Sequence, residues 1–543
     1  MIDDSDIFIF CLSVFIALSV TSAGLYLSDE ISPANQLYQL YHGEQVTYHT
    51  YHYGVYDNGS VNYAISGANY VMPYALTLPV LAFPIYWIID HFQDASRMVP
   101  MIFWILFLSF MVMVGLVNNK KMYVAGALTA IVLFVVNIIL YSLFSGNIEI
   151  LAIVLTNILL YGLFGLLVWK IIFDTRMFNK DNYFLIWILV MSCSSLLFWV
   201  GTLKDHVLVA ALFMVILYSI IKLNKTGKDD YIIYLSIASA MIIWTRPELS
   251  LIIIPLDIIF LLYKYKNLLL KFCIYMGLSS IPMFINNYIV TGGFFKFPFQ
   301  AVENNMGGIH FSSDMYGTLV NEIPAYILKN LSGITPNNIF GLLFLPANKG
   351  VGLVPILMVS IVGILIYLIK YKSIKLTFEE KLLYSSSFVI ILLYLFTSYL
   401  GFGMHTEQGM LPDMRYFSLI YAPLTIASLS VLTRTYEFDY RSMIKTYIIF
   451  IGVSLVIFTI VIALEFPLNI FMNIFGFGVL ILVAKVIIGV IRNNEVKQLG
   501  ELIAILSTVP AIWQIFITIT TSKMYIYPMF IPVIEFVKSI IFI

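Results

Sequence analysis

The chain has 543 residues, of which 61% are hydrophobic and 11% charged, and its 30 basic and 30 acidic side chains give a net charge of zero. This balance gives no indication of nucleic acid or of an acidic partner. Many continuous apolar runs are long enough to cross the ~30 Å hydrocarbon layer as helices. They lack the alternation of apolar and polar residues that a barrel strand requires, so a β-barrel is excluded. The composition therefore predicts an all-α polytopic integral membrane protein.

The first apolar run, roughly Ile7 to Leu27, predicts a transmembrane helix. Acidic residues precede it where a secretory signal would carry Lys or Arg, so we expect the helix to be retained. The acidic pair Asp29-Glu30 follows directly. A carboxylate at the membrane surface suits an enzyme that deprotonates a hydroxyl beside a lipid-linked phosphate. The alternative is a solvated pair that only caps the next helix.

A long polar loop, from Ser28 to about Arg97, is expected on the outer side of the membrane. Within it, Pro33 to Gly43 has the spacing of an amphipathic helix lying on the bilayer surface. Tyr51 to Ala64 alternates around Asp57-Asn58-Gly59 and predicts a tight hairpin. The apolar stretch from Val71 to Ile89 is interrupted by three prolines, so we expect it to lie at the outer interface without crossing. The many tyrosines of the loop fit an interfacial belt or, alternatively, a sugar-stacking surface.

The basic residues predict the topology. About twenty of the 30 Lys and Arg side chains fall in short loops, which the positive-inside rule places in the cytoplasm. About fifteen crossings then follow the first outer loop, with a second large outer loop from about Asn286 to Lys349. The expected cytoplasmic loops lie at residues 120–121, 170–180, 222–228, 264–271, 370–381, 434–445 and 492–497.

The remaining charges predict a site on the outer face. A cation within a turn of an apolar run is costly unless it is paired, so a group of such cations beside acidic residues indicates function. Arg offers a fork of donors that matches phosphate oxygens, and Lys a compact charge, so together they would hold a phosphate leaving group. The candidates are Asp29, Glu30, Arg97, Lys204, Asp205, His206, Arg246, Glu248, Lys349, His405, Arg415 and Tyr416.

Several candidates have simpler interpretations. Lys204 and Asp205 would form a local ion pair in a turn, and Arg246 and Glu248 would neutralise each other around Pro247. Arg415 would be an anchor whose side chain reaches back to water. His405 and Glu407 are too few ligands for a metal site, and His49 and His52 are set aside because their stretch is predicted to be extended.

Six segments, taken in chain order, resemble a known family. They are SDEISPANQLYQL, MPYALTLPVLAFPIYWI, WTRPE, NNYIVTGGFFKFPF, LFLPANKGVGLVPIL and GMLPDMRYFSLIYAPL. Their order and spacing, from about residue 7 to residue 430, resemble the GT-C superfamily of membrane glycosyltransferases. The branch concerned holds the protein O-mannosyltransferases and the lipid A aminoarabinose transferases.

The resemblance implies a GT-C-like bundle of about 13 to 16 transmembrane helices that transfers a sugar from a polyprenyl phosphate on the outer side, usually with inversion. It implies that Asp29 is the general base and Glu30 its supporting neighbour. Arg415 would contact the donor phosphate, with Lys349, Lys204 and Arg246 as further candidates. The chain has no WWDYG motif, which favours a single-sugar donor over an oligosaccharide.

These inferences divide the chain into a catalytic region, residues 1–435 with outer loops 28–97 and 286–349, and C-terminal transmembrane helices, residues 436–543. The expected partners are a polyprenyl-phosphate sugar, membrane lipid, and a protein, lipid or glycan acceptor. No obligatory cofactor is expected, although a carboxylate cluster would accept a divalent cation. A prokaryotic composition favours the plasma membrane. The competing interpretations are a transporter or flippase of lipid-linked sugars and a glycan polymerase or ligase.

Overall fold

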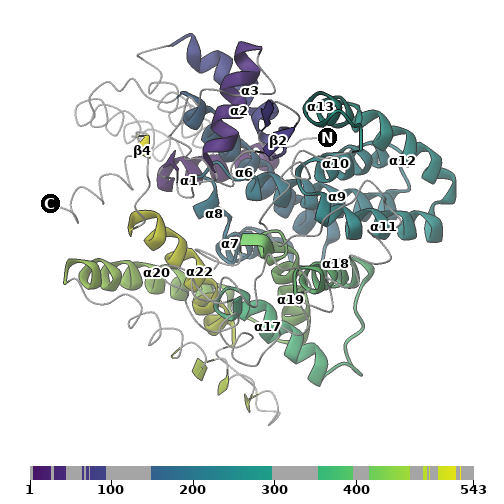
Figure 1. Ribbon diagram of the computed structural model, residues 1–543. Helices are drawn as coiled ribbons and strands as arrows, with labels where there is room; N and C mark the ends of the chain where they lie inside the picture. Colours follow the sequence, from purple (N-terminus) through teal and green to yellow (C-terminus); the bar gives the residue numbers. More distant parts are fainter. Residues whose placement is uncertain are drawn as a thin grey trace. The chain divides into compact units, whose positions relative to one another are not determined.

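The computed structural model describes residues 4–21, 23–25, 30–43, 64–66, 69–71, 74–92, 148–295, 353–395, 415–464, 478, 481–482, 484–485, 488–489, 499–520 and 526–527 (Figure 1). These residues are mostly helical, and the strands among them are two or three residues long. The cysteines, Cys11, Cys193 and Cys273, are free.

Within the described part of the chain, four helical segments are long and apolar enough to cross a membrane. A fifth is added if two helices bent by 41° at Ser280 count as one broken span. This fits the α-helical membrane class predicted from composition. The four segments are Ile148–Thr175, His206–Thr226, Tyr440–Val461 and Leu499–Thr518.

The chain forms two compact units that interleave along the sequence. The first takes its described residues from 1–166, 199–325 and 521–538, and the second from 167–198 and 326–520. The first unit contains α1 (Asp4–Val20), α2 (Ile31–His42), α3 (Thr77–Asp90), the first part of α6 (Ile148–Thr175), α9 (His206–Thr226), α10 (Tyr231–Thr245), α11 (Pro247–Lys264), α12 (Lys266–Ser279) and α13 (Ile281–Thr291). The second contains the rest of α6, η3 (Lys180–Asn182), α7 (Tyr183–Ser192), most of α8 (Leu196–Trp199), α17 (Leu353–Ile369), α18 (Phe378–Leu395), η7 (Arg415–Phe417), α19 (Tyr421–Thr435), α20 (Tyr440–Ala463) and α22 (Leu499–Thr520).

The first helix is shorter than its apolar run suggests. Helix α1 ends at Val20 instead of near Leu27, and β1 (Ala23–Gly24) follows, paired antiparallel with β4 (Ile526–Tyr527). The backbone N–H of Gly24 also donates to the Gly201 carbonyl at 3.3 Å. These backbone partners replace the helical bonds that the expected extension would have made.

Helix α2 confirms the helix predicted from Pro33 to Gly43 but not its exposed position. Asn35, Gln36 and Gln39 are buried, and the Gln36 amide donates to the Tyr74 carbonyl at 2.8 Å. The helix packs against α3, which lies beside it in Figure 1. The Gln36 side chain therefore finds its partner inside the protein, and the expected bilayer-surface helix is an internal one.

A second contact ties α2 to the end of α3. The Tyr41 hydroxyl donates to the Asp90 carboxylate at 2.8 Å, and this bond is the main cause of a raised pKa for Tyr41. The Tyr41 ring also lies 4.6 Å from the Tyr86 ring. The segment predicted to be the first outer loop thus contains two helices joined by aromatic and hydrogen-bonded contacts, with α3 running without a break through Pro84.

The loop also contains a hairpin in a different place from the predicted one. The predicted hairpin around Asp57-Asn58-Gly59 lies outside the described residues. The observed one pairs β2 (Ala64–Ser66) with β3 (Asn69–Val71), leaving only Gly67 and Ala68 between them. A two-residue connection beginning with glycine is a common hairpin signal, although the sequence analysis did not use it.

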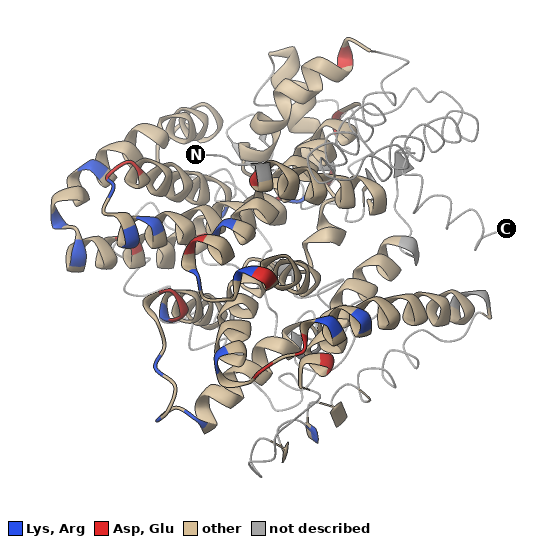
Figure 2. Ribbon diagram, turned by 180° about the vertical axis from the view of Figure 1, so that it is seen from behind, with Lys and Arg blue, Asp and Glu red and all other residues tan. Residues whose placement is uncertain are grey.

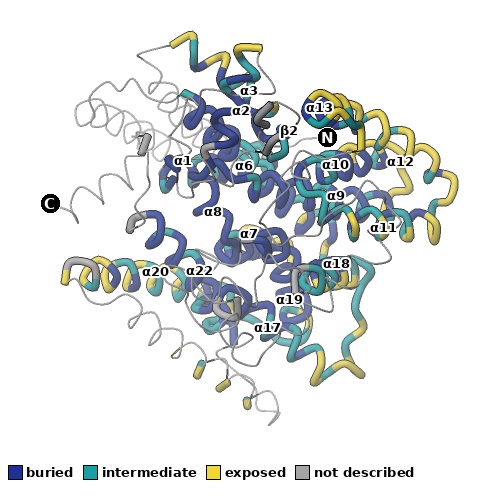
Figure 3. The backbone as a smooth tube through the Cα atoms, viewed as in Figure 1, coloured by how far each residue is buried: buried dark blue, intermediate teal, exposed yellow. Residues whose placement is uncertain are grey.

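In the first unit, α10 packs against α9, α11 and α12. Gly227 follows the last residue of α9 and Gly292 follows the last residue of α13. Both glycines have the positive φ that suits a glycine C-cap. Helix α11 begins with Pro247, whose missing N–H costs nothing at a helix start. The outer faces of α11, α12 and α13 are largely exposed in Figure 3 and carry Leu, Ile and Tyr side chains, as expected for faces that meet lipid.

In the second unit, α19 packs against α7, α17 and α18, and α22 packs against α7, α17 and α20. Helix α19 is buried over most of its length in Figure 3, whereas α20 exposes many Ile and Val side chains. The approach of α17 to α19 is close. A Cβ added at Gly363 of α17 would lie only 2.8 Å from the Cα of Ser428.

Gly363→Ala is therefore expected to destabilise the second unit by about 1–3 kcal/mol, because the added carbon meets backbone that cannot rotate away. Gly452→Ala in α20 is the matched control, since nothing lies within 4 Å of its added Cβ. Thermal unfolding of both variants in the same detergent provides the measurement. Equal melting temperatures for the two variants would show that α17 and α19 are not this close.

Candidate functional site

The candidate site of the first unit is formed around the connection between α8 and α9, residues 200–205. This connection is not helical, and all of it except Asp205 is buried. Buried backbone needs partners. The amide of Asn157, itself fully buried in α6, donates to the Thr202 carbonyl at 2.9 Å and to the Lys204 carbonyl at 3.2 Å. Asn157 therefore fixes the path of the backbone just before Asp205.

Glu30 lies against the same connection. It directly precedes α2, is fully buried, and accepts a hydrogen bond from the Leu203 backbone N–H at 3.3 Å through Oε2. Together with the bond between Gly24 and Gly201, this places the segment after α1 beside the start of α9. Two groups of predicted site residues, more than 170 positions apart in the sequence, are thus brought together.

Lys204 is 9% exposed, and its ammonium lies 5.4 Å from the centre of the Tyr74 ring. This geometry is that of a cation–π contact, which is stronger where the cation is shielded from water. Tyr74 lies in the predicted outer loop, between β3 and α3, and its carbonyl also accepts the bond from Gln36. The loop and the Lys204 ammonium therefore meet at Tyr74.

Asp205 and Arg246 form a two-point ion pair. The guanidinium donates from Nε to Oδ2 at 2.8 Å and from Nη2 to Oδ1 at 2.5 Å. The two side chains are 20% and 19% exposed. Glu248 lies farther away, with its Oε1 3.6 Å from Arg246 Nη1. The ion pair that Asp205 forms is thus with Arg246 and not with Lys204, and Arg246 favours Asp205 over Glu248.

His206 is the first residue of α9 and is buried. Its ring lies 4.7 Å from the Trp199 ring in an edge-on arrangement. This contact joins the two ends of the connection. His206 thus supports the connection through its ring contact with Trp199.

The other predicted residues are not joined to this group by the described structure. Arg415 begins η7, and Tyr416 beside it is buried, in the second unit. The roles predicted for both remain predictions. Asp29, Arg97, Lys349 and His405 lie outside the described residues, as do His49 and His52. Within the described ranges, no three His, Cys, Asp or Glu side chains are arranged to hold a metal ion.

Two residues were missed by the sequence analysis. Asn157 is one, and its signal was a single amide inside the apolar run IVLTNILL. The other is Asp257, a single carboxyl halfway along α11, which is 1% exposed and accepts a hydrogen bond from the Ser239 hydroxyl of α10 at 2.8 Å. An ionisable residue at such a depth in an apolar helix indicates function or a helix-to-helix contact.

No protein-family model matches this chain, and searches of curated proteins and of solved structures gave no significant match.

Proposed function

We propose that the chain is a membrane glycosyltransferase of the GT-C type, which transfers a single sugar from a polyprenyl phosphate to an acceptor hydroxyl on the outer face of the plasma membrane, with inversion. The proposal includes the full bundle of about 13 to 16 helices with its two outer loops. It is supported by the six segments that resemble this superfamily and by the chemistry of the site.

The observation that carries the proposal is the contact of Glu30 with the connection that bears Lys204 and Asp205. Displacing a lipid phosphate requires a base for the attacking hydroxyl and positive charge for the leaving group. An acidic segment and a shielded ammonium meet within one part of the first unit. In the proposed mechanism, Asp29 next to Glu30 takes the acceptor proton while the phosphate departs toward cations.

The proposal assigns distinct roles to the two basic residues of the group. Lys204 would contact the departing phosphate, because its ammonium lies over a ring face and is largely shielded from water. Arg246 would hold Asp205 and so orient the residue next to Lys204. Arg415 and Lys349 remain further candidates for the donor phosphate, as the family resemblance implies. Metal is not required in this scheme, and transfer should persist in excess EDTA.

The test is an assay of the purified protein with a panel of polyprenyl-phosphate sugars and release of polyprenyl phosphate as the readout. We expect release that depends on one donor class and on an acceptor hydroxyl. Lys204→Gln should slow this release on the order of 10²-fold, since a preorganised charge acts mainly on the transition state. A folded protein that releases no lipid phosphate with any donor or acceptor in the panel would contradict the proposal.

One observation favours a second candidate, a transporter or flippase of lipid-linked sugars. Asp257 lies midway along α11, whereas the other charges considered lie near helix ends, and transporters place polar groups near the bilayer midplane. In proteoliposomes, this candidate predicts that the protein moves a lipid-linked sugar across the bilayer and releases no lipid phosphate. Asp257→Asn should abolish this movement. If the protein instead transfers sugar to an acceptor, and Asp257→Asn leaves the rate of that transfer unchanged, the role of the carboxyl is the contact with Ser239.

A further inference from the structure

A short, lysine-rich connection joins α17 to α18 in the second unit. Its sequence is KYKSIKLT over residues 370–377, and Lys381 follows in the first turns of α18. Lys372, Lys375 and Lys381 are exposed. In Figure 2 the connection is blue over much of its length. The positive-inside rule places it on the cytoplasmic side.

The first half of this connection is held by its own backbone. The Lys370 carbonyl accepts from the Ser373 N–H and hydroxyl, both at 2.9 Å, and from the Ile374 N–H at 3.1 Å. Lys370 Nζ also lies 4.8 Å from the centre of the Tyr436 ring, beyond the end of α19. The chain therefore turns sharply after α17 and is fixed to the end of α19.

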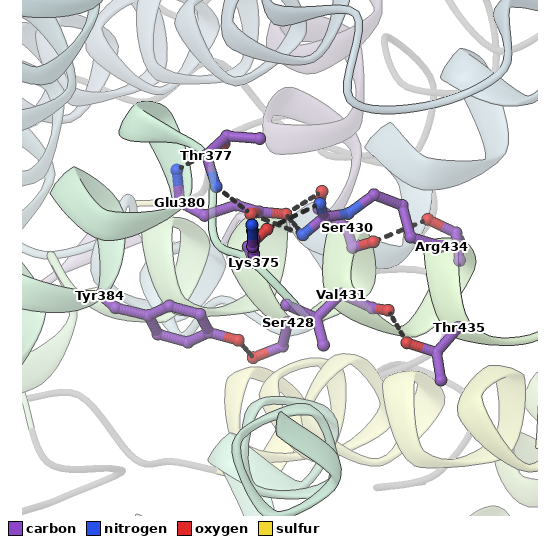
Figure 4. Close-up of polar contacts among 10 residues, drawn as sticks. Lys375, Thr377, Glu380, Tyr384, Ser428, Ser430, Val431, Arg434 and Thr435 are labelled. Atoms are coloured by element: carbon purple, nitrogen blue, oxygen red, sulfur yellow. Dashed lines mark hydrogen bonds and ion pairs between the residues drawn. The ribbon is translucent and has the colours of Figure 1, made fainter. Parts of the chain in front are cut away.

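The second half is held by a buried carboxylate, shown in Figure 4. Thr377 and Glu380 form a capping box, in which the Thr377 N–H donates to Glu380 at 2.8 Å and the Glu380 N–H to the Thr377 hydroxyl at 3.3 Å. Arg434 of α19 donates to both oxygens of Glu380 at 2.5 and 2.6 Å and, through Nη1, to the Lys375 carbonyl at 3.2 Å. Ser430 also donates to Glu380 at 2.6 Å.

This arrangement has an electrostatic consequence. The side chain of Glu380 is fully buried and its charge is matched by Arg434, so it does not neutralise the lysines around it. The acidic residues left nearby in sequence are Glu379, which is partly buried, and the exposed Glu437 and Asp439, which follow Tyr436. Three lysines of the connection and Lys381 of α18, four lysines within twelve residues, thus lie on a segment whose backbone is held at three carbonyl or N–H positions.

Exposed apolar side chains lie beside the lysines. Leu368, Ile369 and Tyr371, at the end of the apolar helix α17, are 58%, 43% and 58% exposed. Aliphatic and aromatic side chains followed directly by lysines form the pattern of a segment at the boundary between acyl chains and headgroups. The lysines then lie at headgroup depth, where a surface of anionic lipid attracts each of them.

We propose that residues 370–381 form a binding surface for acidic phospholipids of the cytoplasmic leaflet, with Lys372 and Lys375 contacting the phosphate headgroups and the Glu380–Arg434 pair holding the connection in place. Lysine suits this partner, because a mobile point charge accepts many headgroup geometries. The surface belongs to the second unit and does not depend on the proposed transferase activity.

The experiment measures phosphatidylglycerol retained by the detergent-purified protein, by native mass spectrometry, and its loss as salt increases. Lys372→Gln combined with Lys375→Gln should weaken retention by about fivefold for each lysine removed. The charge-preserving pair Lys372→Arg and Lys375→Arg should retain the lipid. The control pair Lys225→Gln and Lys228→Gln removes two exposed lysines, Lys225 from the last turn of α9 and Lys228 from the connection between α9 and α10.

We expect retention of phosphatidylglycerol to fall in the Lys372→Gln and Lys375→Gln pair and not in the arginine pair or the control pair. We also expect that excess phosphatidylcholine or inorganic phosphate does not displace the bound phosphatidylglycerol. Equal retention in the glutamine pair and the unmodified protein would overturn the proposal. So would an equal loss in the control pair, because a general positive surface would then account for binding. Displacement by inorganic phosphate would assign the site to free anions instead of to a leaflet.

Discussion

Arg246→Ala is expected to lower both the stability of the first unit and the rate of sugar transfer. Without Arg246, the Asp205 carboxylate would keep its largely shielded position but lose its two-point partner. Removing one member of such a pair costs about 2–4 kcal/mol, because the remaining charge is left partly desolvated. Transfer should fall on the order of 10²-fold, since Asp205 adjoins Lys204 and small displacements of a positioned group are costly.

A double-mutant cycle isolates the pair itself. Asp205→Ala, Arg246→Ala and the double variant should give a coupling of about 2 kcal/mol in thermal or denaturant unfolding. The matched control is the cycle for Lys271 and Asp229 in the same unit, an ion pair at 2.8 Å whose side chains are 52% and 48% exposed. Water screens that pair, so its coupling should be about 0.5 kcal/mol or less. Similar couplings in the two cycles would contradict the shielded position of Asp205.

Arg246→Lys tests the geometry separately from the charge. Lysine keeps the positive charge but cannot donate in parallel to both carboxylate oxygens, so stability should lie between that of the unmodified protein and Arg246→Ala. Transfer by Arg246→Lys as slow as that by Arg246→Ala would show that the two-point geometry matters more than the charge. The stability measurement requires no assumption about the donor.

The sequence was informative where local chemistry decides structure. The spacing of Pro33 to Gly43 predicted α2, and the apolar runs predicted the helical membrane class. The environment of α2 was not predictable in the same way, because Gln36 is buried only when Tyr74 supplies its partner. A pattern of polar residues does not distinguish water from a protein carbonyl.

The candidate site was predictable as a set of residues but not as a set of pairs. Lys204, Asp205, Arg246 and Glu248 were singled out because charges near apolar runs are rare. Their pairing depends on helix packing: Asp205 bonds to a residue 41 positions away instead of to its neighbour. The contact of Glu30 with Leu203 spans 173 positions and involves a backbone N–H, which leaves no trace in side-chain patterns.

Asp29→Asn is expected to abolish transfer while the protein remains folded and inserted. Asp29 itself lies outside the described residues, but Glu30 beside it is fixed against the connection that bears Lys204. A general base contributes about 10²–10⁴-fold to the rate, and asparagine cannot accept the proton. The measurement is release of polyprenyl phosphate at saturating donor, with donor affinity determined in parallel, because loss of the base should lower kcat and leave binding unchanged.

Glu30→Gln is the matched control for that variant. Glutamine retains a carbonyl oxygen that accepts from the Leu203 N–H, so the backbone contact and the fold should persist. If Asp29 is the base, Glu30→Gln should retain most of the activity that Asp29→Asn loses. The reverse result, an active Asp29→Asn and an inactive but folded Glu30→Gln, would transfer the role to the buried carboxylate. Full activity in both variants would remove the acidic pair from the mechanism, because neither carboxylate would then be needed to take the acceptor proton.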